Sequence, residues 1–189
     1  MAGSDAGEVT VLLQRAAAGD AVARSRLAEV VYHELRAMAV MHLRGMRGST
    51  LQPTALVHEA WLKLAGHDAY SGREHFLGVA GKAMRSVLVD HVRSKRAEKR
   101  GGGVGRRELD EAVAFYESGE VDLLDLDDAL GDLERDDPQL ARWVEMRFFG
   151  GLGNREIAVV EGCSESTIER GWRAARARLA HRLAAGGGE

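Results

Sequence analysis

The chain has 189 residues, of which 45% are hydrophobic and 5% aromatic, and its 26 basic and 29 acidic residues leave a net charge of −3. This length suits one domain or two small ones, and a composition rich in Ala, Leu, Arg and Glu with only two prolines predicts an all-α fold without a sheet. The single cysteine, Cys163, excludes an internal disulfide and a cysteine-based zinc cluster.

The start of the sequence lacks the basic and then apolar pattern of a signal peptide, and no run of about 18 apolar residues could cross a membrane. Together with the lone cysteine, these features lead us to expect a cytoplasmic protein without membrane insertion.

Two helices are predicted before residue 66. Asp20 is placed to cap the first, whose buried face we expect at residues spaced three or four apart. Pro53, at a first-turn position, opens the second, which carries an apolar stripe and ends near Gly66. The apolar stripe of the second helix could belong to the core of the protein or form a face that docks on another protein. The buried face expected for the first helix consists of Leu27, Val31, Leu35 and Met38.

A third helix is predicted from about His75 to Arg100, after a polar loop that carries Tyr70. The first half of this helix is apolar and the second half is almost purely cationic. A cationic helix end can simply be solvated, because positive side chains there are favoured by the helix dipole.

Charge is segregated along the chain. Residues 85–107 carry eight basic and two acidic residues, whereas residues 108–137 carry one basic and thirteen acidic residues. Such tracts can pair with each other inside the molecule or bind different partners, and the charge pattern alone leaves both interpretations open.

An acidic segment without a clear hydrophobic period separates two helical parts. We expect residues 101–122 to form a flexible linker between one small helical domain at 1–100 and another at 123–185. Helical spacing resumes at Leu123, and Asp137-Pro138 supplies an N-cap and a first-turn proline for a helix that ends at Gly150.

The strongest local signal spans residues 154–178 and is typical of a helix-turn-helix. Ala158 is small where two helices cross, Gly162 can adopt the left-handed conformation of a tight turn, and Ile168 fills the space between the helices. Ser164 is expected to cap the second helix. Arginines along that helix could reach DNA phosphates, and polar residues near its start could reach base edges. An ordinary helical hairpin with a solvated arginine face is the alternative.

We find no catalytic constellation and no motif for a metal or cofactor. The glycine-rich segment 101–105 lacks the Gly-Lys-Ser/Thr of a phosphate-binding loop, and His58-Glu59 lacks the second histidine of a zinc protease. No serine or cysteine lies in a recognisable nucleophile motif. We therefore do not expect an enzyme.

Three collinear segments resemble the extracytoplasmic-function (ECF) sigma factors, and specifically the ECF-like subfamily. They are LQPTALVHEAWLKLAG from Leu51, AMRSVLVDHVRSKRAEKRGGG from Ala83 and VEMRFFGGLGNREIAVVEGCSESTIERGWRAARARL from Val144. The resemblance covers nearly the whole chain. It implies an RNA polymerase sigma factor, which directs core polymerase to specific promoters and assists promoter melting.

The resemblance also implies three sets of binding residues. The residues that would dock on core polymerase are Leu56, Val57, Glu59, Ala60, Trp61 and Leu64. Binding of the minus-ten element falls to Tyr70, Arg73, His75, Lys82, Arg85, Ser86, Asp90 and Arg93. Binding of the minus-thirty-five element by the helix-turn-helix falls to Arg155, Ser164, Ser166, Thr167, Glu169, Arg170, Arg173 and Arg176.

The implied partners are the core of bacterial RNA polymerase, through the clamp of its largest subunit and the flap of the second, and promoter DNA. An anti-sigma factor is a further candidate partner, and no cofactor is implied. The acidic linker would follow the basic RNA path of the polymerase.

Two other classes of protein remain as alternatives. A one-component helix-turn-helix transcriptional regulator would bind a palindromic operator as a dimer, without polymerase. A helical interaction protein without a nucleic-acid role would show no salt-dependent binding to DNA.

Overall fold

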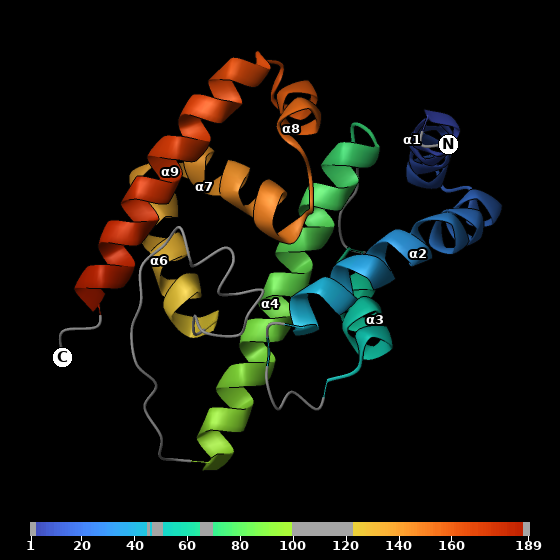
Figure 1. Cartoon of the computed structure of the whole chain (residues 1–189). Coiled ribbons are helices and arrows are strands. Elements are labelled where there is room, and N and C mark those ends of the chain that lie inside the picture. Colours follow the sequence, from blue (N-terminus) through green and yellow to red (C-terminus); the bar gives the residue numbers. More distant parts are fainter. Residues whose placement is uncertain (1–2, 45, 47–50, 65–69, 100–122, 187–189) are drawn as a thin grey trace.

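A computed structural model describes residues 3–44, 46, 51–64, 70–99 and 123–186 (Figure 1). All regular structure in these ranges is helical and none of it is strand, which confirms the predicted all-α fold class. Within the same ranges, every helix is too short or too polar to cross a membrane. The linker predicted at 101–122 lies outside the described residues.

The N-terminal half contains α1 (Gly3–Ala17), α2 (Ala21–Arg44), α3 (Pro53–Leu64) and α4 (Arg73–Lys99). The predicted starts of α2 and α3 are confirmed, because Asp20 Oδ1 accepts a hydrogen bond from the Ala23 amide at 2.9 Å and Pro53 is the first residue of α3. The sequence pattern predicted no element before Asp20. The structure adds α1 there, which buries Val9, Leu12 and Leu13.

The C-terminal half contains α6 (Leu123–Asp136), α7 (Pro138–Val144), η1 (Glu145–Phe149), α8 (Asn154–Glu161) and α9 (Glu165–Gly186). Asp137 caps α7 as predicted, with its Oδ1 3.1 Å from the Leu140 amide. The helix expected to end at Gly150 is α-helical only as far as Val144. Its last turn, η1, is a π-helix, in which the Gly150 amide donates to the Glu145 carbonyl at 3.0 Å.

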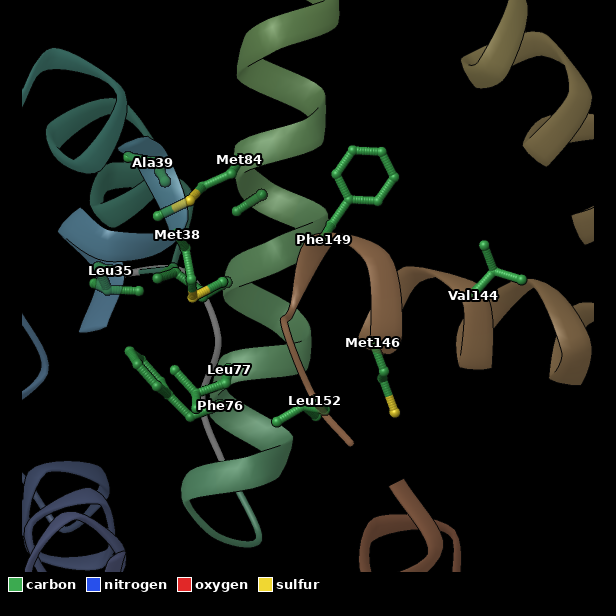
Figure 2. Packing of buried hydrophobic residues seen from close by; sticks show 14 of the residues in the cluster. Leu35, Met38, Ala39, Phe76, Leu77, Met84, Val144, Met146, Phe149 and Leu152 are labelled. Atoms are coloured by element: carbon green, nitrogen blue, oxygen red, sulfur yellow. The ribbon is translucent and has the colours of Figure 1, made fainter. Parts of the chain in front are cut away.

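Helix α4 is the central element of the molecule, with α2 and α3 on one side and the C-terminal helices on the other (Figure 1). Figure 2 shows Met38 and Ala39 of α2 facing one side of α4, while Phe149 of η1 lies against another side. The buried residues of both halves form one continuous cluster. The helices on either side of the predicted linker therefore share a single core.

Close approach of helices at two places requires glycine. A Cβ atom at Gly81 of α4 would lie 2.5 Å from the Phe149 carbonyl carbon and 2.5 Å from the Gly150 amide nitrogen. A Cβ atom at Gly171 of α9 would overlap the ring of Trp143. The lack of a side chain at Gly171 therefore allows α9 to pack against α7, even though glycine has a low helix propensity.

Candidate nucleic-acid and polymerase interfaces

Helices α8 and α9 form the predicted helix-turn-helix. Gly162 ends α8 at φ +64°, and the Cys163 amide donates to the Ala158 carbonyl at 3.1 Å. Ala158 and Ile168 are buried between the helices, as expected. The geometry of the turn therefore confirms the roles predicted for these residues.

The first turn of α9 carries a cluster of hydroxyl groups. Ser164 Oγ accepts a hydrogen bond from the Thr167 amide at 3.2 Å, so it caps the helix as predicted. The same oxygen lies 2.9 Å from Ser166 Oγ and 2.8 Å from Thr167 Oγ1. The start of α9 thus presents a group of small polar side chains at the N-terminus of the helix.

Most residues expected at the minus-thirty-five element lie on the surface of this unit. Thr167 and Arg176 are half-buried. The guanidinium group of Arg178 lies 3.0 Å from Asp137 Oδ2. The exposed ones are Arg155, Ser164, Ser166, Glu169, Arg170 and Arg173.

Arg85, expected at the minus-ten element, is almost fully buried against the C-terminal half. Its guanidinium nitrogens lie 2.7 Å from Asp127 Oδ1 and 2.6 Å from Glu145 Oε1. It also donates to the Asp127 carbonyl at 3.1 Å and stacks 5.8 Å from the ring centroid of Phe149. Four interactions therefore tie one α4 side chain to α6 and η1.

Lys82 and Arg93 flank Arg85 on α4 and bind the same acidic surface. Lys82 Nζ lies 3.1 Å from Glu134 Oε1 and 3.5 Å from Glu145 Oε2. Burial lowers the pKa of Lys82, but the two carboxylates outweigh it and the net pKa is raised, so the ammonium form is favoured. Arg93 lies 3.1 Å from Asp127 Oδ2.

Comparison with known proteins gives one match, to a protein family. The family model for ECF sigma factors matches residues 6–185, nearly the whole chain. This chain belongs to the ECF sigma factor family. No curated protein and no solved structure matches it.

The family defines the activity. This sigma factor is a transcription initiation factor that directs core RNA polymerase to specific promoters and assists their melting, with core polymerase and promoter DNA as its partners. The one-component regulator weighed from the sequence is not favoured, since the match extends over the N-terminal helices as well as the helix-turn-helix.

In this sigma factor, helix α3 buries most of the residues expected to dock on polymerase. Glu59 is exposed, and Trp61 is half-buried with its ring 6.5 Å from that of Phe76. The exposed face of α3 includes Leu62, which is 69% exposed and which the sequence analysis did not select. The fully buried members of the expected set are Leu56, Val57, Ala60 and Leu64.

The residues before and at the start of α4 are held by contacts with one another and with α2, α3 and α8. The Tyr70 hydroxyl donates to the Leu64 carbonyl at 3.0 Å, and burial raises the pKa of Tyr70 to about 12. His75 Nδ1 accepts from the Ser71 amide at 3.2 Å. Arg73 lies 3.0 Å from Glu34 of α2 and 3.5 Å from Glu156 of α8.

Ser86 and Asp90 lie on a different face of α4 from Arg85. Lys63 of α3 joins them, with its Nζ 2.6 Å from Ser86 Oγ and 3.2 Å from Asp90 Oδ2. The residues expected at the minus-ten element are therefore divided between an α3-facing group and a group facing the C-terminal half.

Sequence reasoning did not select the acidic partners of α4, which are Asp127, Glu134 and Glu145. The segregation of basic and acidic tracts was the signal that could have found Asp127 and Glu134, whereas Glu145 and Lys82 lie outside those tracts. Of the two interpretations left open for that segregation, intramolecular pairing is the one that the structure shows for residues 82–93 and 127–145.

Proposed function

We propose that this sigma factor uses three surfaces: the exposed face of α3 for core polymerase, α4 for the minus-ten element, and the helix-turn-helix for the minus-thirty-five element. The surface of α9 is the observation that best supports this division. Its first turn offers hydroxyl groups, and Arg170 and Arg173 are exposed on the next turns. In a recognition helix, groups near the N-terminus reach base edges and arginines further along reach phosphates.

The minus-ten surface would work by binding alone. Capture of a flipped base and neutralisation of the backbone of a separated strand offset the free energy of lost stacking. Lys82, Arg85 and Arg93 lie along one face of α4 and would supply the positive charge. Polymerase itself performs the chemistry of RNA synthesis.

Docking on polymerase would use the outer face of α3. Leu62 is a large apolar side chain in contact with solvent, and Glu59 is exposed on the same helix. The four buried residues of the expected set would act indirectly, because they seat α3 against α2 and α4. We assign this face to the clamp of the largest subunit and the helix-turn-helix domain, 123–185, to the flap of the second.

A reconstituted transcription assay tests the function. Core polymerase is incubated with genomic promoter fragments, with and without the protein, and complex formation with core is measured in parallel. We expect promoter-dependent transcripts only when the protein is present. Failure to form a complex with core would contradict the proposal.

A matched pair of variants tests the α3 assignment. Leu62→Ser removes the exposed apolar side chain of α3, whereas Val22→Ser changes a 75% exposed apolar side chain of α2. We expect Leu62→Ser to raise the Kd for core polymerase about tenfold, or ~1.4 kcal/mol, and Val22→Ser to leave it unchanged. Equal effects of both variants would remove α3 from the interface.

A further inference from the structure

Helix α9 has one packed side and one open side. Ile168, Ala175 and Leu179 are buried where α9 meets α6, α7 and α8. Figure 1 shows α9 at the edge of the molecule, with these three helices on the same side of it. The other side, near the start of α9, is available to a DNA groove. Its exposed residues are Ser166, Glu169, Arg170 and Arg173.

Glu169 is the acidic member of this exposed set. Other carboxylates of the C-terminal half are neutralised by arginine, since Glu161 lies 3.0 Å from Arg142 and Asp137 lies 3.0 Å from Arg178. The Glu169 carboxylate has no such partner in the part of the chain that the structure describes. A full negative charge therefore stands on the surface that we assign to DNA.

A carboxylate in a DNA groove lowers the affinity unless a base binds it, because the phosphates repel it. In the major groove, guanine and the oxygen of thymine present only acceptors, which repel a carboxylate as well. Amino donors are offered by cytosine at N4 and by adenine at N6. Adenine places its N7 acceptor beside that donor, whereas cytosine has no acceptor there. Cytosine is therefore the base that best satisfies a carboxylate.

The place of Glu169 on α9 suits contact with a base edge. It lies one turn after Glu165, the first residue of the helix, and residues near the N-terminus of a recognition helix reach the bases. The hydroxyl groups before it are bound to one another around Ser164. A carboxylate is also a stronger hydrogen-bond acceptor than a hydroxyl group. Glu169 is therefore the strongest acceptor on this part of α9.

We propose that Glu169 is a specificity-determining residue, which accepts a hydrogen bond from the N4 amino group of one cytosine in the minus-thirty-five element. This proposal rests on the function assigned above to the helix-turn-helix. Repulsion by the phosphates offsets the hydrogen bond, so the contact adds little to the total affinity. Its effect is selectivity, because guanine or thymine at the same position loses the hydrogen bond and adds repulsion.

Selection from a promoter library tests the base that Glu169 contacts. Holoenzyme, made from core polymerase and the full-length chain, is incubated with variants of one promoter that the transcription assay identifies. The base pairs around its minus-thirty-five element are randomised and the rest is kept, and the bound fragments are sequenced. For the wild-type chain, we expect one position at which cytosine is enriched about tenfold over guanine and thymine.

Three variants identify the residue responsible. Glu169→Ala should remove the preference at that position alone and raise binding to the whole library, because a negative charge is lost. Glu169→Gln should replace cytosine by adenine there, since glutamine pairs with adenine N6 and N7. Glu165→Gln makes the same charge change at another exposed position of α9 and should keep the cytosine. Because Glu169 is exposed, and alanine and glutamine favour helix, its variants keep α9 folded.

Three results would overturn the role of Glu169: identical base preferences in Glu169→Ala and wild type, a wild-type preference for guanine or thymine at the position that this variant changes, or loss of the cytosine in Glu165→Gln. Each of them leaves the helix-turn-helix assigned to the minus-thirty-five element. A holoenzyme that enriches no base around that element is a different result, which would contradict the assignment of the helix-turn-helix and the role of Glu169 with it.

Discussion

Arg85 of α4 and Glu145 of η1 form a buried ion pair 2.6 Å long, with side-chain exposures of 10% and 7%. Glu145 and Phe149 are four residues apart at the two ends of η1, and residues at this spacing lie on one side of a helical turn. Both then contact the same guanidinium group. The pair joins the two halves of the chain.

We predict that Arg85→Met destabilises the protein by about 3 kcal/mol, because it leaves Glu145 buried with only the partly exposed Lys82 nearby. The measurement is the free energy of unfolding in urea. The double variant Arg85→Met/Glu145→Met should recover about 1 to 3 kcal/mol of coupling relative to the sum of the single variants. Additive effects would mean that the two groups do not interact.

Gly171→Ala should destabilise the protein even though alanine favours helix. The gain in helix propensity is up to about 1 kcal/mol, but the new methyl group lies within 2.5 Å of Trp143 Cε3 and 3.1 Å of Leu140 Cδ2, and overpacking costs about 1 to 3 kcal/mol. Gly131→Ala in α6 is the control, and it should stabilise by up to about 1 kcal/mol. Thermal unfolding measures both, and stabilisation by Gly171→Ala would contradict the packing of α9 on α7.

Acid should weaken the contact between α2 and η1 through His42. The ring is buried, its Nε2 lies 2.9 Å from the Phe149 carbonyl oxygen, and burial lowers its pKa despite that hydrogen bond. The folded state therefore favours the neutral ring. Its contribution to stability is complete above the unfolded pKa of about 6.5 and is lost as the pH falls below that value.

Urea midpoints between about pH 5 and pH 8 test this prediction. His42→Asn keeps a donor near the carbonyl without an imidazole and should reduce the fall in midpoint below about pH 6.5. His58→Asn, on the exposed face of α3, removes an imidazole from a solvated position and serves as the control. If both variants keep the wild-type pH profile, His42 does not control the acid sensitivity.

Arg173→Ala should weaken binding of the polymerase holoenzyme to promoter fragments about tenfold, across sequences, through loss of a phosphate contact. The slope of log affinity against log salt should fall by about 0.9. Arg178→Ala is the matched change, since the Arg178 guanidinium is engaged with Asp137 at 3.0 Å, and it should have a smaller effect. An unchanged salt slope in Arg173→Ala would exclude Arg173 from the DNA interface.

The amino-acid sequence by itself was sufficient for most of the helices, their caps and the tight turn, but not for α1 or the π-turn η1. Asp20, Asp137 and Ser164 cap the helices expected of them, and Gly162 has the positive φ that the turn requires. These features depend on hydrogen bonds and backbone sterics within a few residues, so local patterns predict them. The family resemblance was visible for the same reason, because its motifs are contiguous segments.

Only the tertiary structure determined which charged side chains form ion pairs and whether the apolar stripe of α3 lies in the core. Arg85 is separated by 42 residues from Asp127 and by 60 from Glu145, and no local rule pairs them. Burial of Leu56 and Ala60 likewise depends on how α3 seats between α2 and α4. The physical reason is that both ion pairing and burial depend on distance in space, which the chain sets only when distant helices pack together.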